Sequence, residues 1–338
     1  MTMGGGDSTH GCALPGPASP DLRIAALSDG RAGNARQATA LAAALGAPPD
    51  AIVLDPRAPW RWAAPRRLPG DSGAFGQSLD TVRRDPPALA IGCGRQAALA
   101  TRLLRGRGRA PGTRSVQILD PRLHPRHWDL VVVPEHDRLR GANVLTLLGS
   151  LHPVDAAWLA RARAGFDAFA ALPRPRTALL VGGPSAHMRF DAASLRALLA
   201  CLAAARRREG GGSVLATTSR RTPPALAARL RDALRDCPGV VWTGHRDGAN
   251  PYPGLLAWAD RIVCTADSVN MISEACATTV PVFVAEPQRV GGGPRRFVEA
   301  LRARGRIRAL DDALVAYAVE PLLETARIAA EVRARLAC

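Results

Sequence analysis

The sequence predicts an α/β protein made of two Rossmann-like, doubly wound domains, and three observations lead to this fold class. The chain has 338 residues, 47% of them hydrophobic, which is more than a single core usually organises. Short β-rich runs that end in small or polar residues alternate with Ala-, Leu- and Arg-rich stretches, the pattern of parallel βαβ units. A proline-rich segment at 172–176 interrupts this alternation, which then starts again.

The first half contains six expected strands. The first, at 22–27, leads into a polar glycine turn and a helix over 35–45, and a further helix is expected over 153–169. We therefore expect an N-terminal domain over residues 21–171. A leader over residues 1–20, rich in Gly and Pro and without signal-peptide features, is expected to be disordered. The other five strands are expected at 51–54, 89–91, 115–118, 130–133 and 143–146.

The second half repeats the same pattern, so a C-terminal domain is expected over residues 172–313. Two helical stretches rich in Ala, Leu, Glu and Arg are expected over 314–338, and we expect them to cross back and brace the first domain. The expected strands of the second domain are 177–181, 213–217, 240–242, 261–264 and 280–285, and its expected helices include 192–207, 224–235 and 254–258.

The composition argues against a nucleic-acid partner. The formal net charge is +16, and all 45 basic residues are Arg. This skew, with heavy use of Ala, is typical of GC-rich coding, which adds basic charge without a partner that requires it. Aromatic residues make up only 4% of the chain, so few side chains are available to stack on bases.

One local group of basic residues has two interpretations. It is either a solvated loop or a surface that contacts an anionic membrane or a phosphorylated acceptor, since basic residues are attracted to such head groups. The group spans the Arg102–Arg126 region and comprises Arg102, Arg105, Arg107, Arg109, Arg114, Arg122, His124, Arg126 and His127.

The cysteines and apolar runs indicate a cytoplasmic protein, at most peripheral at the inner membrane. Seven scattered cysteines without a CxxC pair argue against a disulfide framework and against a zinc site. The longest apolar runs are far shorter than the ~20 residues of a membrane span. No HExxH, GxSxG or P-loop pattern and no dense carboxylate cluster is present, which favours chemistry without a metal or a cofactor.

Ligands of open parallel sheets bind outside the carboxyl ends of the strands, so the loops there are candidate sites. In the second half, the turn 182–185 offers backbone N–H groups and a hydroxyl to a phosphate, although a tight structural turn explains it equally well. The hydroxyls and guanidiniums in the loop 217–223 suit the binding of a pyrophosphate. The alternative is that the hydroxyls cap the start of the following helix. The candidate donor-binding residues here are Gly183, Ser185, Thr218, Ser219 and Arg220.

The segment 266–275 lies between an expected strand and an expected helix. Its carboxylate Glu274 suits the two hydroxyls of a ribose, with a surface acid as the alternative. The ring of Tyr252 would stack on a nucleobase or pack in the core. The candidate donor-binding residues of this part are Asp267, Ser268, Met271 and Glu274, preceded by Asn250 and Tyr252.

In the first half, the turn 28–34 precedes a helix and has two interpretations: an anion site at the N-terminus of that helix, or a structural turn in which Asp29 or Asn34 caps the helix. Residues 133–137 place further ionisable side chains at a strand end. A base that accepts a hydroxyl proton is therefore available from Asp29, Glu135 or His136, with Asp137 beside them.

Taken in order, these segments resemble the mitochondrial fission ELM family of plants and its bacterial relatives. The resemblance runs from about residue 22 to the C-terminus and includes the segments 295–297 and 320–326. Its motifs are 28–34 with Gln37, 133–137, 182–185, 217–223, 250–252 and 265–275.

The resemblance implies a GT-B-like fold and a glycosyltransferase that moves a sugar from a nucleotide-sugar donor to a cell-envelope saccharide or lipid-linked acceptor. The nucleotide sugar is then a substrate, and Gly33, Asn34 and Gln37 would line the acceptor side of the cleft. One departure is the pair Ala35 and Arg36 between Asn34 and Gln37, where an acidic residue is expected in relatives. Two alternatives remain open: a nucleotide-sugar epimerase on the same fold, and a scaffold or binding protein of this family without turnover.

Overall fold

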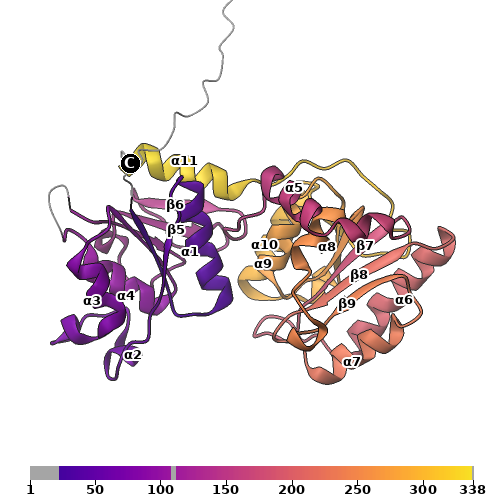
Figure 1. Ribbon diagram of the computed structural model, residues 1–338, viewed down its shortest axis with the longest axis horizontal. Helices are drawn as coiled ribbons and strands as arrows, with labels where there is room; N and C mark the ends of the chain where they lie inside the picture. The colour runs from indigo at the N-terminus through magenta and orange to yellow at the C-terminus, as the bar shows by residue number, and fades with distance from the viewer. Residues whose placement is uncertain (1–22, 108–111, 337–338) are drawn as a thin grey trace, which may run out of the picture.

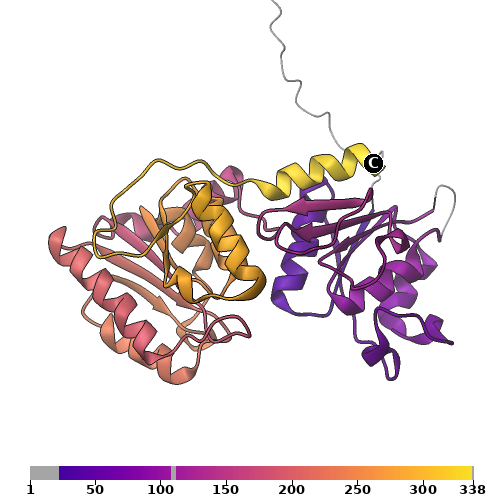
Figure 2. The same ribbon diagram turned by 180° about the vertical axis from the view of Figure 1, so that it is seen from behind.

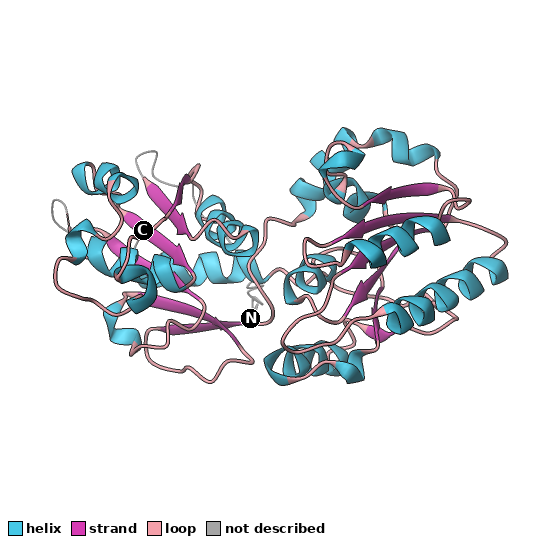
Figure 3. Cartoon of the chain, turned by 90° about the horizontal axis from the view of Figure 1, so that it is seen from below, coloured by secondary structure: helices cyan, strands magenta, loops and turns pink. Residues whose placement is uncertain are grey.

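The computed structural model describes residues 23–107 and 112–336. Within them the chain forms two α/β units, each built on a six-stranded parallel sheet (Figures 1 and 3). The predicted fold class is therefore confirmed. The expected leader over residues 1–20 lies outside the described residues, as do Cys12, Arg109 and Cys338.

The sheet of the first unit has the order β2-β1-β3-β4-β5-β6. The chain moves outward from β1 to β2 on one side and then continues from β3 on the other, so the order reverses between β1 and β3. The strands are β1 (Ile24–Ser28), β2 (Asp50–Val53), β3 (Leu89–Cys93), β4 (Arg114–Ile118), β5 (Leu130–Pro134) and β6 (Val144–Leu147). The helices are α1 (Ala32–Ala44), α2 (Trp60–Ala63), α3 (Gln77–Arg84) and α4 (Arg95–Leu104).

Both faces of this sheet are covered, as the alternation along β1 shows. Ile24 and Ala26 pack in one core cluster with α1, whereas Ala25 and Leu27 pack in another with α3 and α4. Successive side chains of a strand point to opposite faces, so β1 contributes to both cores.

The sheet of the second unit has the order β12-β11-β10-β7-β8-β9, which also reverses once, between β7 and β10. The strands are β7 (Arg176–Val181), β8 (Ser213–Thr218), β9 (Gly239–Trp242), β10 (Arg261–Thr265), β11 (Val282–Ala285) and β12 (Arg308–Ala309). The helices are α6 (Ala192–Arg208), α7 (Pro224–Ala233), α8 (Tyr252–Trp258), α9 (Val269–Cys276) and α10 (Gly292–Ala303).

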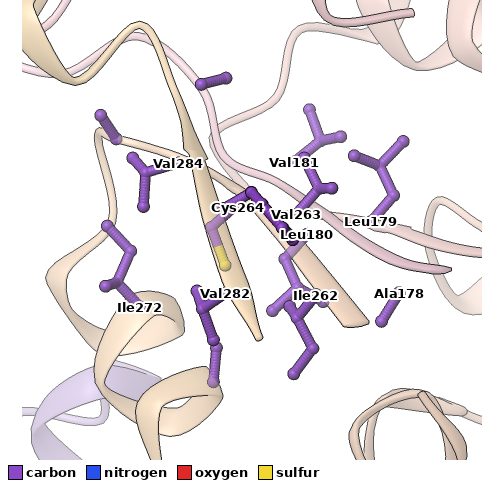
Figure 4. Packing of buried hydrophobic residues seen from close by; sticks show 14 of the residues in the cluster. Ala178, Leu179, Leu180, Val181, Ile262, Val263, Cys264, Ile272, Val282 and Val284 are labelled. Atoms are coloured by element: carbon purple, nitrogen blue, oxygen red, sulfur yellow. The ribbon is translucent and has the colours of Figure 1, made fainter. Parts of the chain in front are cut away.

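The centre of the second sheet is mostly apolar and fully buried because helices cover both of its faces. Every residue of β7, β10 and β11 is buried, and their branched side chains interdigitate (Figure 4). Each fully buried Val, Leu or Ile contributes ~1.5–3 kcal/mol relative to exposure. This packing fixes the strand ends from which the loops of the site emerge.

Two segments connect the units. Helix α5 (Ala156–Gly165) precedes the proline segment on which the predicted domain boundary was based, yet it packs against α8 of the second unit. Helix α11 (Glu324–Leu336) returns to the first unit and packs beside α1 (Figures 1 and 2). Its residues Ile328, Ala329 and Val332 are buried in the first core, which confirms the expected crossing back.

The prediction of two helical stretches after residue 313 is wrong in part, because residues 314–336 contain one helix, α11. Residues 313–323 are not helical. The hydroxyl of Tyr317 bonds to the backbone of Val282 in β11, and the N–H of Leu322 donates to the carbonyl of Cys276 at 2.8 Å. These tertiary contacts, together with Pro321, outweigh the local helix propensity.

Candidate functional site

The two sheets meet at their carboxyl edges. Arg36 lies on α1, directly after β1, and contacts Glu274 on α9, which follows β10. Close by, the Nδ2 atom of Asn270 on α9 would lie 2.8 Å from a Cβ at Gly33. The places where the strand order reverses, between β1 and β3 and between β7 and β10, are called switch points. The two switch points therefore face each other, and ligands of such sheets bind at switch points.

Asp267 organises the loops at the β7/β10 switch point. Its side chain is fully buried and accepts hydrogen bonds from the Thr265 hydroxyl (2.6 Å), the Gly183 N–H (3.0 Å) and the Arg221 guanidinium (2.7 Å). A Cβ at Gly182 would lie 2.1 Å from the carboxylate oxygens, so only glycine permits this approach. Asp267 is thus engaged by protein groups and shapes the surface around it.

The loop after β8 leaves one charged group free. The Thr222 hydroxyl accepts from the N–H of Ser219 at 3.0 Å and donates to the carbonyl of Gly182, so it joins the β7 and β8 loops. Thr218 is buried at the end of β8. Arg220 is exposed and has neither an ion pair nor a side-chain hydrogen bond within residues 23–107 and 112–336.

Two serine hydroxyls accept hydrogen bonds from nearby backbone. Ser185 Oγ accepts from the N–H groups of His187 (3.2 Å) and Met188 (3.1 Å), and Ser268 Oγ accepts from that of Met271 (3.4 Å) and caps α9. Each hydroxyl keeps its own proton for donation. The first N–H groups of α9 have no partner within the helix, so this end of the second unit offers several donors to an anion.

Glu274 makes the central contact between the units. Its side chain is 2% exposed; Oε1 accepts from Arg36 at 2.5 Å, and Oε2 accepts from the Tyr252 hydroxyl. Burial, together with the charge of Glu274, raises the pKa of Tyr252 well above its usual value, so the phenol stays protonated. Burial alone would lower the pKa of Arg36, but the ion pair with Glu274 outweighs it and the pKa is raised. A ribose would reach Glu274 only after Arg36 moved.

In the first unit, Asp29 forms the turn after β1. Its Oδ1 accepts from the N–H of Arg31 (3.1 Å) and from Nδ2 of Asn34 (2.9 Å). A Cβ at Gly94 would lie 2.6 Å from Nδ2 of Asn34, so the loops after β1 and β3 touch. Gln37 is buried further along α1. The turn is therefore held mainly by its own side chains.

The loop after β5 brings an imidazole to the N-terminus of α10. Arg296 of α10 donates to the carbonyl of His136 at 2.5 Å, and a Cβ at Gly293 would lie 2.8 Å from the His136 ring. Partial burial lowers the pKa of His136, against the opposing effect of Asp137. The imidazole is therefore neutral at pH 7 and can accept a proton.

Two other residues that the sequence suggested for the site, Glu135 and Asn250, lie at the surface. Glu135 lies 3.6 Å from Arg304 in an exposed ion pair. Asn250 is exposed, and its Oδ1 accepts from the N–H of Tyr252 at 3.0 Å, so it starts α8.

Sequence reasoning missed the basic partners of the two buried carboxylates. Arg36 pairs with Glu274 across 238 residues of sequence, and Arg221 with Asp267 across 46. No spacing rule relates residues so far apart.

The glycines at 291–293 were also missed. The N–H of Gly291 donates to the carbonyl of His187 at 2.8 Å, while Gly293 lies against His136 of the first unit. Three glycines at the start of a helix are a signal for close approach of an anion to its N-terminus, and this signal was present in the sequence.

Neither a metal centre nor a membrane span is found in the described part of the chain. No group of three His, Cys, Asp or Glu side chains there is arranged to hold a metal ion. No helix there has the length and apolar character needed to cross a bilayer.

Solved structures with a similar chain path share little sequence with this chain. The S. aureus MnaA–UDP co-structure has a TM-score of 0.49 at 12% identity, covering 93% of this chain and 97% of that one. UDP-GlcNAc 2-epimerase from Neisseria meningitidis bound to UDP-GlcNAc has a TM-score of 0.48 at 12% identity, covering 92% of this chain and 99% of that one. MurG of Acinetobacter baumannii has a TM-score of 0.41 at 14% identity, covering 87% of each chain. TM-scores below 0.5 carry no information about the chemistry of this chain.

The sequence comparisons are more specific. The family profile described as Mitochondrial fission ELM1 matches residues 32–336. The mitochondrial fission protein ELM1 of Arabidopsis thaliana is 32% identical over 294 residues, covering 78% of this chain and 67% of that protein. The uncharacterized protein RP120 of Rickettsia prowazekii (strain Madrid E) is 23% identical over 355 residues, covering 91% and 97%. Since the profile spans nearly the whole described region, the chain belongs to the mitochondrial fission ELM1 family.

Proposed function

We propose that the chain transfers a sugar from a nucleotide-sugar donor, bound by the second unit, to an acceptor hydroxyl bound by the first. The observation that carries this proposal is the opposition of the two switch points. The β7/β10 switch point presents hydrogen-bond donors and an arginine that is unpaired within the described residues. The first unit presents Asp29 at the β1/β3 switch point, and Glu135 and His136 after β5 at the same edge of the sheet. Such a pair of surfaces suits a reaction between an anionic donor and a neutral hydroxyl.

On the donor side, the diphosphate would lie between Arg220, the hydroxyls of Ser185 and Ser219, and the N-terminus of α9 capped by Ser268. Asp267 and Thr222 hold the backbone of the loops after β7 and β8 before the ligand arrives, and the exposed side chain of Arg220 would turn toward the phosphates on binding. Fixed donors aimed at a leaving group stabilise the charge that develops on it. Met271, on the first turn of α9, would lie beside the donor.

The reaction joins the acceptor oxygen to the anomeric carbon as the bond from that carbon to the diphosphate breaks. The acceptor proton passes to a base, for which His136 suits best, because its burial-lowered pKa keeps it neutral. Asp29 and Glu135 are the other candidates. The acceptor would be a cell-envelope saccharide or a lipid-linked sugar, and no cofactor is needed beyond the nucleotide sugar.

Donor binding is tested first, by thermal stabilisation of the purified protein with UDP-, GDP-, ADP-, CMP- and dTDP-sugars. A ligand at a hundred times its Kd stabilises the folded state by ~2.7 kcal/mol. We expect one nucleotide class to raise Tm, and Arg220→Ala to reduce that rise. Arg229→Ala, at an exposed arginine on α7, is the matched control and should bind like the wild type. If no nucleotide sugar shifts Tm, the proposal fails.

Turnover separates transfer from its alternatives. Transfer releases the nucleotide only when an acceptor is present, whereas an epimerase would convert the donor sugar without one. A scaffold protein would bind the nucleotide without any product. We expect His136→Gln to bind the donor normally and to lose most of the turnover.

A further inference from the structure

The loop after β2 exposes an aromatic side chain among arginines. This loop carries α2, which lies on the side of the first unit opposite α11 (Figure 1). Trp62 is 71% exposed there, whereas Trp60, two residues earlier, packs partly against the core formed with α3 and α4. The indole of Trp62 is therefore presented to the outside rather than used for folding.

Basic side chains surround this indole in the sequence, and two of them are uncommitted. Arg57 and Arg66 are exposed and have no ion pair within the described ranges. Arg61 is 3.4 Å from the exposed Asp55, and Arg67 pairs with Asp71 at 2.6 Å. The loop thus carries two free positive charges on either side of Trp62.

Arginines of α4 hold the loop in place. Arg95 donates to the carbonyl of Arg61 at 3.3 Å, and Arg102 donates to that of Pro65 at 2.6 Å. The position of Trp62 is therefore built into the fold. Arg102 belongs to the basic group for which a solvated loop and a membrane contact were the two interpretations, and here it bonds to Pro65 and lies over the ring of Trp128.

We propose that residues 57–67, with Trp62 at their centre (the Trp62 surface), bind the anionic head-group layer of a membrane. An indole has an apolar ring and a polar N–H, which suits it to the boundary between head groups and acyl chains. Arg57 and Arg66 would be attracted to anionic lipids at the same depth. A single exposed ring suits this role better than single-stranded nucleic acid, which needs successive aromatic platforms.

The strand that leads into the Trp62 surface, β2, ends next to the turn after β1. The exposed Val53, at the end of β2, has its Cγ1 3.1 Å from a Cβ at Gly30. A membrane bound at the Trp62 surface would thus be near the turn that carries Asp29. This would suit a lipid-linked acceptor, although the membrane contact itself does not depend on the proposed transfer.

The test is flotation of the full-length protein with vesicles of phosphatidylcholine alone or mixed with phosphatidylglycerol. We expect binding only to the mixed vesicles, weakened in high salt. Trp62→Ala should weaken it about tenfold, which corresponds to ~1.4 kcal/mol. Arg57→Ala with Arg66→Ala should weaken it by roughly five- to twenty-five-fold, since each basic residue near such a surface contributes ~1 kcal/mol. Trp62→Tyr should retain most of the binding.

Two controls isolate the surface. Val315→Ser removes another exposed apolar side chain, and Arg229→Ala another exposed arginine, both in the second unit, and both should bind vesicles like the wild type. Absence of binding to the mixed vesicles, or equal binding by Trp62→Ala, overturns the proposal. So does tighter binding to a single-stranded oligonucleotide that Trp62→Ala abolishes. Nucleotide-sugar binding, measured without vesicles, reports separately on the proposed transfer.

Discussion

The two switch points differ in how their acidic residues are held. At β7/β10, Asp267 is fully buried and contacts the loops after β7, β8 and β10. At β1/β3, the side chain of Asp29 is 14% exposed, and among the residues that the structure describes it accepts hydrogen bonds from Arg31 and Asn34 of its own turn alone. The second unit therefore presents a surface fixed by long-range contacts, whereas the turn of the first unit is a local structure.

This difference suits a division of labour between the units. A surface fixed by buried charge recognises one ligand shape repeatedly, as a nucleotide diphosphate requires. A local turn can be altered without disturbing the sheet behind it, as acceptor variation would require. The comparison is open to test because each switch point carries one of these aspartates, Asp29 after β1 and Asp267 after β10.

The largest effect is expected from Asp267→Ala. Removing this carboxylate leaves the Gly183 N–H and the proton of the Thr265 hydroxyl buried without an acceptor, and Arg221 without its ion pair. We expect the free energy of unfolding to fall by about 3–4 kcal/mol. The matched change in the first unit, Asp29→Ala, should cost only ~1 kcal/mol. Chemical denaturation of both variants checks this, and equal losses would contradict the comparison.

The next largest effect concerns the contact between the units. Arg36→Ala leaves Glu274 buried with only the Tyr252 hydroxyl, which we expect to cost about 2–3 kcal/mol of unfolding free energy. In a double-mutant cycle with Glu274→Gln, the coupling should be ~1–2 kcal/mol. Additive losses would show that the pair adds nothing to stability.

The same variant sharpens the question of ribose binding. If a ribose takes the place of Arg36 on Glu274, Arg36→Ala will bind the nucleotide sugar more tightly than the wild type does. If Arg36 instead contacts the phosphates, the variant will bind more weakly. Titration calorimetry with the nucleotide sugar selected by the stability panel distinguishes the two outcomes.

Most of the architecture could be predicted because its signals are local. The buried strands β7 and β10 are apolar runs that end in polar turns, and such runs identify parallel strands. The non-helical segment after residue 313 could not be predicted, because Tyr317 is held by β11 through tertiary contacts that no local pattern encodes.

The sequence predicted where the loops of the site lie better than it predicted which side chains contact each other there. The loops that carry Gly183, Ser268 and Asp29 follow strands, so topology alone places them at the switch points. Glu274 was expected to face a ligand, but the structure surrounds it with Arg36 and Tyr252. Which carboxylate is satisfied by protein depends on docking of the two units, and a linear sequence does not show this.

A smaller effect is expected from pH, through the segment that joins the units. His152 is buried, and both its N–H (3.0 Å) and its carbonyl (2.8 Å) bond to the Thr325 hydroxyl at the start of α11. Burial lowers the pKa of His152 below 6.5 and outweighs the opposite effect of Glu274. Below pH 6.5 the unfolded chain therefore binds a proton that the folded chain does not, so stability is present above that pH and is lost as pH falls.

We expect this loss to reach at most about 1.4 kcal/mol per pH unit between the unfolded and folded pKa values. Unfolding measured from neutral to acidic pH should show a shallower fall for His152→Gln than for the wild type. His245→Gln, at an exposed histidine, should follow the wild-type curve. The same slope in all three proteins would mean that other groups cause the pH dependence.

The smallest effect is expected from Asn34→Ala in the turn of the first unit. The bond from its Nδ2 to Asp29 is partly exposed, so its loss should cost only about 0.5–1 kcal/mol of unfolding free energy. If the first unit serves the acceptor, this variant will bind the nucleotide sugar like the wild type but will show a higher KM for the acceptor. A change in nucleotide affinity as large as that of Arg220→Ala would instead place the donor against both switch points, and the proposed division between the units would be wrong.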